Sequence, residues 1–127
     1  MTGLVAQSSV TEAQKQWVAE IVATLGQSIW VEQENLIDAV TAVSGSGPAY
    51  VFLFAQSMIE AGEKLGLSAD QAKQLTLATL QGATELALRS TANLQELRQQ
   101  VTSKGGTTYA AITTMQAEKM PEAIQKG

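Results

Sequence analysis

The sequence contains no cysteine and no histidine among its 127 residues. Their absence excludes disulfides, cysteine nucleophiles, Ser-His-Asp triads and the usual zinc ligand sets, so we expect no metal site. An excess of basic residues is also lacking, since 8 Lys and Arg stand against 12 Asp and Glu and give a net charge of -4. Without a basic stripe to neutralise phosphates, nucleic acid is not an expected partner.

Two kinds of hydrophobic segment are missing as well. The first ten residues, MTGLVAQSSV, carry no basic residue and no long apolar run, so they predict no secretory signal. The most apolar window, PAYVFLFAQSMIEAG, is shorter than the roughly 20 residues that a membrane span requires. We therefore expect a cytoplasmic protein that does not contact a membrane.

What is present is enough apolar residues for one folded domain. The hydrophobic content is 45%, and no internal repeat or flexible linker interrupts the chain, so residues 1–127 are expected to form a single domain. Ser9 and Glu12 fit a capping box for a first helix that Gly26 ends, and a short β-like run follows at Ser28 to Val31.

Glycines separate the second helix from the third. Leu36, Val40 and Val43 lie on one face of a short helix, and Gly45, Ser46 and Gly47 are expected to break it. Pro48 then suits the first position of a helix from about Pro48 to Leu65. This helix is apolar almost all round, so it must be covered on every side, and we expect a second subunit to supply part of the cover.

The remaining pattern is also helical. Ser68 with Gln71 forms a capping box for a long helix that runs to about Arg89, and Asn93 can cap a further short helix. Pro121 is the expected first residue of a last, short helix. The sequence thus predicts an all-α bundle of about six helices.

The stretch VTSKGGTTYAAI, Val101 to Ile112, interrupts this helical pattern. Adjacent glycines allow positive φ, and Thr107 or Thr108 can cap the helix that follows, which would present backbone N–H groups suited to a phosphate or carboxylate. An ordinary helix stop followed by a helix start explains the residues equally well. Lys104 could assist a bound anion or extend into water.

The stretch SGSGPAY, Ser44 to Tyr50, is not a dinucleotide fingerprint. That motif requires G-x-G-x-x-G between a strand and a helix, whereas the sixth position here is Tyr50 and the preceding segment is helical. A tight corner between two helices is the favoured interpretation. No carboxylate lies in an apolar setting that would suit acid–base catalysis, so the acidic residues are interpreted as solvated.

Two segments together resemble the C-terminal domain of pyrroline-5-carboxylate reductase. They are DAVTAVSGSGPAYVF, Asp38 to Phe52, and LQELRQQVTSKGGTTYAAI, Leu94 to Ile112, the second of which matches the family signature V-T-S-x-G-G-x-T. Their separation by a long helix pair matches too, and the resemblance covers essentially the whole chain.

This resemblance implies a fold and an activity. The fold is a helical domain that dimerises by intertwining with its partner, possibly with further association of dimers. The activity is that of an oxidoreductase of proline biosynthesis, which reduces 1-pyrroline-5-carboxylate to L-proline with NADPH or NADH. The nicotinamide cofactor binds an N-terminal Rossmann domain in the family, while the helical domain supplies the substrate pocket.

The resemblance also assigns residues. Ser103, Gly105, Gly106, Thr107 and Thr108 would form the substrate loop, with backbone N–H groups on the carboxylate and the catalytic Thr108 hydroxyl near the ring nitrogen. Ser46, Gly47 and Pro48 match a second glycine-rich segment near the active site and the subunit interface.

Three departures from the family accompany this assignment. No Rossmann domain is present, so the chain alone is expected to bind no nicotinamide and to be inactive. Lys104 replaces a proline common in the motif, and the final helix is shorter than usual. The alternative hypothesis, motivated by the missing cofactor domain, is a stand-alone helical interaction module without catalysis.

Overall fold

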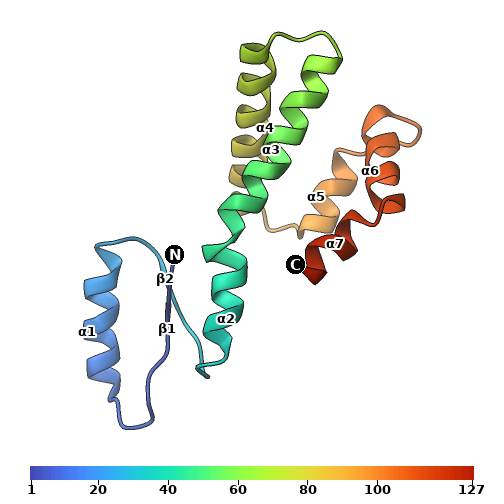
Figure 1. Ribbon diagram of the computed structural model, residues 1–127. Coiled ribbons are helices and arrows are strands. Elements are labelled where there is room, and N and C mark those ends of the chain that lie inside the picture. Colours follow the sequence, from blue (N-terminus) through green and yellow to red (C-terminus); the bar gives the residue numbers. More distant parts are fainter. The chain divides into compact units, whose positions relative to one another are not determined.

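A computed structural model describes residues 1–127 as helices with one small sheet (Figure 1). The chain divides into two compact units, Met1–Thr76 and Leu77–Gly127. In chain order the elements are β1 Thr2–Leu4, α1 Glu12–Ala23, β2 Ser28–Trp30, α2 Leu36–Val40, a π-helical turn Thr41–Gly45, α3 Gly47–Lys64, α4 Ala69–Arg89, α5 Leu94–Gln100, α6 Thr107–Ala117 and α7 Met120–Lys126. The predominance of helix confirms the predicted fold class.

The first unit opens with a β–α–β arrangement. β1 and β2 are parallel, with Gly3 opposite Ile29 in the ladder, so the β-like run predicted from Ser28 is a strand that has a partner. The predicted cap of α1 is wrong, because Thr11 rather than Ser9 occupies the N-cap and exchanges hydrogen bonds with Gln14. Both pairs have capping-box spacing, and Thr11 is the one with the extended backbone, φ -75° and ψ 158°, that an N-cap requires.

The predicted break at residues 45–47 is also wrong. Instead, α2 continues through the π-helical turn into α3, and the Ser46 N–H donates to the Thr41 carbonyl oxygen at 2.9 Å, five residues back. Pro48 explains the wider turn, because it has no N–H for the carbonyl four residues earlier and its ring would crowd that carbonyl in a regular helix. The glycines therefore lie within a helical stretch, at a π-helical turn rather than a corner.

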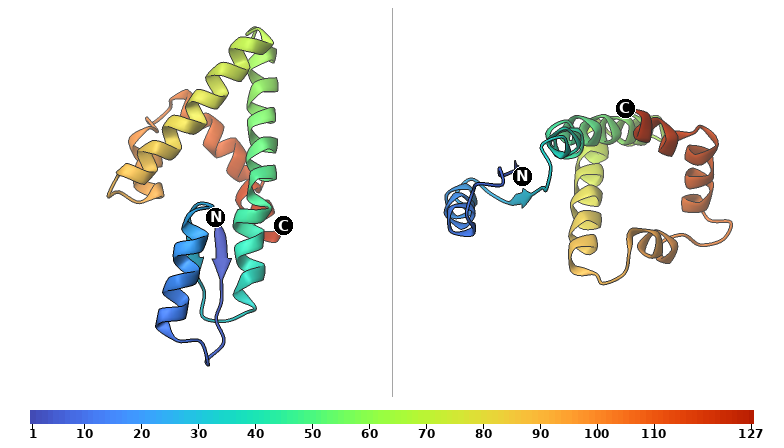
Figure 2. Two further views of the ribbon diagram at one scale, coloured as in Figure 1. Left: turned by 90° about the vertical axis from the view of Figure 1, so that its left-hand side faces the viewer. Right: turned by 90° about the horizontal axis from the view of Figure 1, so that it is seen from below.

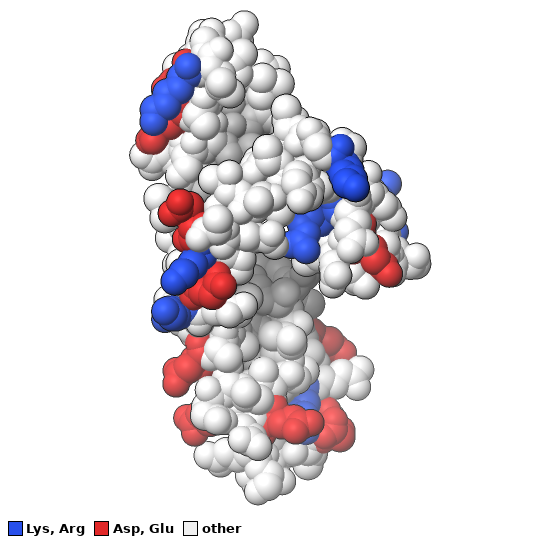
Figure 3. All heavy atoms as spheres, turned by 90° about the vertical axis from the view of Figure 1, so that its right-hand side faces the viewer, with Lys and Arg blue, Asp and Glu red and all other residues white.

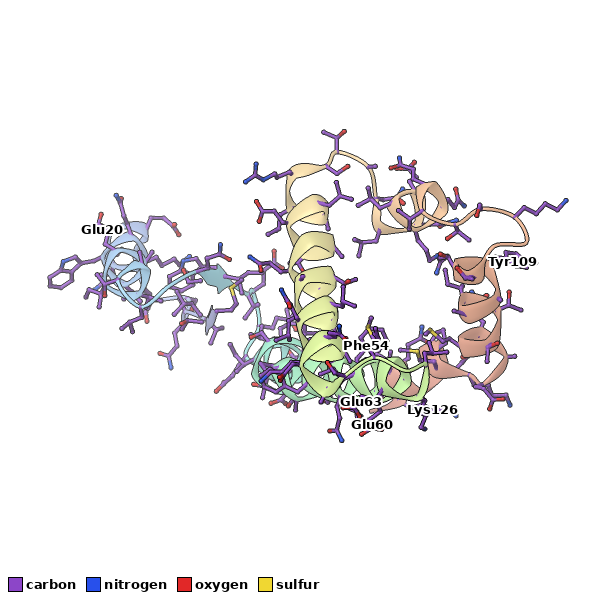
Figure 4. All side chains as sticks on the ribbon, turned by 90° about the horizontal axis from the view of Figure 1, so that it is seen from above. Glu20, Phe54, Glu60, Glu63, Tyr109 and Lys126 are labelled. Atoms are coloured by element: carbon purple, nitrogen blue, oxygen red, sulfur yellow. The ribbon has the colours of Figure 1, made fainter.

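Because α2 continues into α3, the apolar helical stretch is longer than the sequence predicted. The stretch Leu36–Lys64 has an 18-residue window with a mean hydropathy of 1.3, and it is long and apolar enough to cross a membrane by length and composition. The expectation that no apolar segment is long enough to span a membrane is wrong, because it assumed that the glycines before Pro48 divide this helical stretch in two. A core helix of a soluble protein passes the same test, and Glu60 and Glu63 on α3 (Figure 4) are charges that a membrane interior disfavours.

The ends of α4 confirm the sequence prediction. Ser68 and Gln71 exchange hydrogen bonds of 3.0 and 3.3 Å, and the helix ends at Arg89 as expected. α4 approaches α3 closely where Gly62 lies, since a Cβ atom at Gly62 would stand 3.1 Å from the Ala72 Cβ atom. The absence of a side chain at Gly62 allows this contact.

The second unit contains the short helices α5, α6 and α7. Asn93 caps α5 as predicted, by accepting from the Glu96 N–H at 2.9 Å while the Glu96 carboxylate accepts from the Asn93 N–H. Lys119 has a left-handed backbone with φ 59°, and this residue makes the sharp turn between α6 and α7 that is visible in Figure 2. Pro121 lies in the first turn of α7, close to its predicted place.

Almost nothing is buried inside the single chain. The buried residues are small ones, Ala55, Ala72 and Thr76, which are 2 to 6% exposed and belong to α3 and α4. On α3, Phe52 and Leu53 are 70 and 66% exposed. Figure 3 shows the charged side chains in separate groups with wide uncharged surface between them. The helix expected to need cover on every side therefore remains largely uncovered within one chain.

Capping hydrogen bonds therefore contribute much of the stability of the short helices. We expect Asn93→Ala to lower the free energy of unfolding by about 1 kcal/mol, because the Glu96 N–H at the start of α5 loses the side-chain oxygen that accepts its hydrogen bond. Asn35→Ala is the matched control: Asn35 is the N-cap of α2 but makes no side-chain hydrogen bond there, and its loss should cost less than about 0.5 kcal/mol. Urea unfolding followed by circular dichroism measures both values, and equal losses would contradict the assignment.

Candidate functional site

The predicted substrate loop connects α5 to α6 in the second unit. Thr102 closes the end of α5, because its hydroxyl donates to the Arg98 carbonyl at 2.6 Å and its N–H donates to the Gln99 carbonyl at 3.1 Å. Gly105 then takes a positive φ of 75°, a conformation that favours glycine. The chain thus turns sharply at Gly105 and enters α6.

The start of α6 has no side-chain cap. The prediction that Thr107 or Thr108 caps the helix is wrong, because Gly106 is the N-cap and both threonines are the first helical residues. The N–H groups of Thr107, Thr108 and Tyr109 therefore have no acceptor within the protein. Three free donors at the positive end of an 11-residue helix can bind a carboxylate or phosphate oxygen.

Ser103 lies directly over the N-cap. A Cβ atom on Gly106 would stand 2.5 Å from the Ser103 Oγ atom, and the Gly106 N–H donates to the Ser103 carbonyl at 3.1 Å. Close approach of Ser103, rather than the backbone angles, therefore favours glycine at position 106, since these angles are extended at φ -79° and ψ 172°. This contact places the Ser103 hydroxyl beside the start of α6.

The other side chains around the loop are open to solvent. Lys104 is exposed and forms no ion pair, since the two ion pairs of the chain are Lys15 with Glu12 and Arg89 with Glu85. Tyr109, labelled in Figure 4, projects from the first turn of α6 and is 51% exposed. Unlike Thr114 in the same helix, whose hydroxyl donates to the Ala110 carbonyl at 3.1 Å, Thr108 uses its hydroxyl for no internal hydrogen bond.

Ser46, Gly47 and Pro48 belong to the first unit, whereas the loop belongs to the second. They lie where the π-helical turn meets α3, and a Cβ atom on Gly47 would meet no other atom within 4 Å. π-helical turns inside α-helices are frequent at functional sites, and proline after glycine is the one sequence feature that could have indicated this one.

The first unit also has a hollow of about 810 Å³ between α1 and the segment after β2. It contains none of the predicted site residues, and among the residues lining it are Glu12, Lys15, Trp30 and Glu32. Lys15 is paired with Glu12 at 2.7 Å, so the one basic side chain that lines the hollow is already neutralised. No group of three or more acidic residues gathers in a metal-binding arrangement.

Comparison with known proteins identifies the family of this chain. A family model described as pyrroline-5-carboxylate reductase dimerisation matches residues 34–127, which include both glycine-rich segments. The chain belongs to the pyrroline-5-carboxylate reductase family. The resemblance first noted in two motifs is thereby confirmed, and the matched region is a dimerisation domain, which indicates self-association.

Individual relatives extend the match to nearly the whole chain. The chain is 47% identical over 125 residues to pyrroline-5-carboxylate reductase of Pseudomonas aeruginosa, with 98% of this chain and 46% of that protein covered. It is 43% identical over 104 residues to pyrroline-5-carboxylate reductase 2 of Bacillus subtilis, with 82% and 37% covered. The chain thus spans less than half the length of these relatives.

Solved structures of the family agree with the fold. The pyrroline-5-carboxylate reductase of Coxiella burnetii superposes with a TM-score of 0.92 at 41% identity, covering 98% of this chain and 46% of that one. The Plasmodium falciparum enzyme, solved with NADP bound, gives a TM-score of 0.86 at 31% identity and covers 98% and 48%.

The contact between Ser103 and Gly106 can be tested directly. We expect Gly106→Ala to displace the Ser103 side chain, because the added Cβ atom would lie 2.5 Å from Oγ, and to shift the amide NMR signals of residues 103–108. Gly47→Ala is the control, since its Cβ atom would enter open space and should perturb only its immediate neighbours. If the alanine at 106 left the signal of Ser103 in place, the packing of the loop described above would be incorrect.

Proposed function

We propose that this chain is the dimerisation and substrate-binding part of a pyrroline-5-carboxylate reductase, the enzyme that reduces 1-pyrroline-5-carboxylate to L-proline in the cytoplasm. The observation that carries the proposal is the coincidence of two findings on one segment. The family match includes residues 101–112, and in the structure that same segment leaves three helix-start N–H groups without an acceptor.

The substrate is a five-membered cyclic imine with one carboxylate. In the proposed complex the N–H groups of Thr107, Thr108 and Tyr109 hold the carboxylate oxygens, and the Ser103 hydroxyl lies close enough to the helix start to add a fourth donor. The backbone of Gly105 and Gly106 lets the substrate approach without a side chain in the way. Binding a small anion at several donors fixes its orientation, which is the main contribution that positioning makes to catalysis.

Thr108 is the proposed catalytic residue because its hydroxyl is not used within the protein. Hydride addition to the carbon of the protonated C=N bond places the electron pair of that bond on nitrogen and gives the neutral secondary amine, which then takes up a further proton from water. A hydroxyl hydrogen-bonded to this nitrogen stabilises the change and keeps the imine carbon facing the hydride donor. Ser46, Gly47 and Pro48 are proposed to lie near this site at the subunit interface.

The glycine-rich stretch before α3 does not have the geometry of the dinucleotide fingerprint. SGSGPAY lies in a π-helical turn and the first turn of a helix, not between a strand and a helix, so it cannot cradle a pyrophosphate as the dinucleotide fingerprint does. We propose that NADPH or NADH, the source of the hydride, binds the part of the longer enzyme outside this chain, and that the chain alone is inactive. The bound NADP of the Plasmodium falciparum relative supports a nicotinamide cofactor.

The first test concerns Thr108 in the full-length reductase. Thr108→Ala should lower kcat/KM roughly 10- to 100-fold while the protein stays dimeric. A loss of this size is expected when one hydrogen bond to a charged group, or to a group that becomes charged during the reaction, is removed. Thr113→Ala, which removes an exposed hydroxyl about one and a half turns further along the same helix, should change kcat/KM by less than about threefold. Unchanged kinetics of Thr108→Ala would remove the loop from the active site and favour a helical module without catalysis.

The second test concerns the homodimer. We propose that the exposed apolar side chains of α3 pack against a second copy of the chain, because Tyr50, Val51, Phe52 and Leu53 are 50 to 70% exposed and belong to the matched dimerisation region.

Light scattering at micromolar concentration should therefore report a dimer for this chain and a monomer for Phe52→Glu, since a carboxylate buried in an apolar interface is strongly unfavourable. Gln56→Glu adds the same charge one turn later, at a position that is already polar and exposed, and should leave the dimer intact. A dimeric Phe52→Glu variant, or a monomeric parent chain, would show that α3 is not the interface.

A further inference from the structure

Lys104 is the one charged side chain in the predicted substrate loop and in α6. No other Asp, Glu, Lys or Arg occurs between Arg98 and Glu118, so residues 99–117 carry a single full charge, and that charge is positive. The chain as a whole has a net charge of -4. An acidic protein repels a small anion on average, and an isolated positive charge raises the concentration of that anion in its neighbourhood.

The Lys104 ammonium has no partner within the chain. Its side chain is exposed, and the two ion pairs of the chain lie on α1 and α4. The shape of the loop does not depend on this side chain either, because Gly105 makes the turn at φ 75° and the Gly106 N–H donates to the Ser103 carbonyl at 3.1 Å. The charge of Lys104 is therefore available to a ligand of the loop, and its removal should leave the backbone of the loop in place.

The free donors at the start of α6 are close to Lys104. Thr107 is three positions further along the chain, and three residues span at most about 11 Å even when fully extended. Gly105 and Gly106 have no side chains that could stand between the two residues. The flexible four-carbon stem of lysine can shorten the distance further. A carboxylate held at the start of α6 would thus lie within roughly one Debye length of Lys104 at 0.1 M salt, which is about 10 Å.

Lysine at this position suits attraction over a distance rather than a fixed hydrogen bond. The backbone N–H groups at the start of α6 and the Ser103 hydroxyl already supply donors in fixed directions. Lysine instead carries a compact, strongly hydrated charge on a flexible stem. Two unit charges several ångströms apart in water attract each other by an energy that corresponds to a change of a few fold in binding. The charge of Lys104 should therefore affect how tightly the anion is held more than how its atoms are oriented.

We propose that Lys104 attracts the substrate carboxylate to the loop and thereby lowers the KM for 1-pyrroline-5-carboxylate in the longer reductase. This role rests on the proposed function, because it takes the substrate carboxylate as the anion that the α6 donors hold. It also distinguishes Lys104 from the other loop residues, since only a full charge makes the binding of the anion depend on ionic strength. If Lys104 merely extends into water, its charge has no effect on KM.

Steady-state kinetics of the full-length reductase test this role. The KM for the substrate is measured at saturating nicotinamide cofactor for the parent enzyme and for Lys104→Gln, which removes the charge and keeps a flexible polar side chain. We expect this KM to rise about threefold in about 0.1 M NaCl. In about 1 M NaCl, where the Debye length is about 3 Å, the rise should fall below about 1.5-fold. The value of kcat should change less than KM, because the ammonium takes no part in hydride transfer.

Two further variants separate the charge from its position. Lys104→Arg keeps the charge and should keep KM within about 1.5-fold of the parent value at both salt concentrations. Lys119→Gln makes the same change in net charge at an exposed residue beyond the other end of α6. At the rise of an α-helix this residue lies roughly 18 Å from Thr107. That separation exceeds the Debye length in 0.1 M NaCl, so Lys119→Gln should also leave KM within about 1.5-fold of the parent value.

Several outcomes would overturn the role of Lys104. They are a KM for the substrate that is equal in the parent and in Lys104→Gln, an equal rise in Lys119→Gln, and a rise that persists undiminished in 1 M NaCl. A rise confined to the KM of the nicotinamide cofactor would also overturn it, because the charge would then act on the other anion of the reaction.

These outcomes are distinct from a failure of the proposed function. If Lys104→Gln had no effect while Thr108→Ala still lowered kcat/KM, the loop would remain the substrate site and only the role of Lys104 would be lost. Full activity of Thr108→Ala, in contrast, would remove the loop from the active site whatever the behaviour of Lys104.

Discussion

The folded form of this chain depends on burying apolar surface that the chain cannot bury by itself. Within one copy only Ala55, Ala72 and Thr76 are buried, while residues as large as Phe52 and Trp17 are at least two thirds exposed. Burying one large apolar side chain contributes about 1.5–3 kcal/mol, so a fold that leaves most of them in water lacks the main term that opposes chain entropy. The match to a dimerisation region agrees with this constraint, since a second copy brings another polypeptide surface against this one.

The exposed surfaces lie in two parts of the chain, inside and outside the matched dimerisation region. α3 lies within the matched dimerisation region, and its apolar side chains are contiguous along one helix, which suits helix packing against a second copy. β1 and β2 lie outside that region, and their outer edges present backbone groups that take no part in the ladder. The polar strand edges and the apolar helix therefore favour different kinds of contact.

Local signals predicted the helices well where side chains bond to their own turn. Ser68 with Gln71 and Asn93 with Glu96 are capping boxes in both the sequence and the structure, because their hydrogen bonds span only three residues. The incorrect predictions fall where two local patterns compete for the same position, or where a contact between residues far apart in the sequence determines the local structure. Ser9 and Thr11 both had capping spacing, and the glycines before Pro48 matched a helix break although the chain continues through a π-helical turn. β1 escaped notice because its pairing with β2 joins residues 26 positions apart.

The candidate site shows the same division. The two glycines and the family motif predicted a candidate loop at residues 103–108 with backbone N–H donors, but they did not predict its cap, because Gly106 rather than a threonine precedes the first helical residue. These donors stay in place only while the short helices around them stay ordered. α5 and α7 have seven residues each, too few for stability in isolation, and Leu94 and Ile124 within them are 73 and 64% exposed. Any contact that covers these side chains therefore also holds the loop, and by linkage a carboxylate bound to the loop stabilises that contact in return.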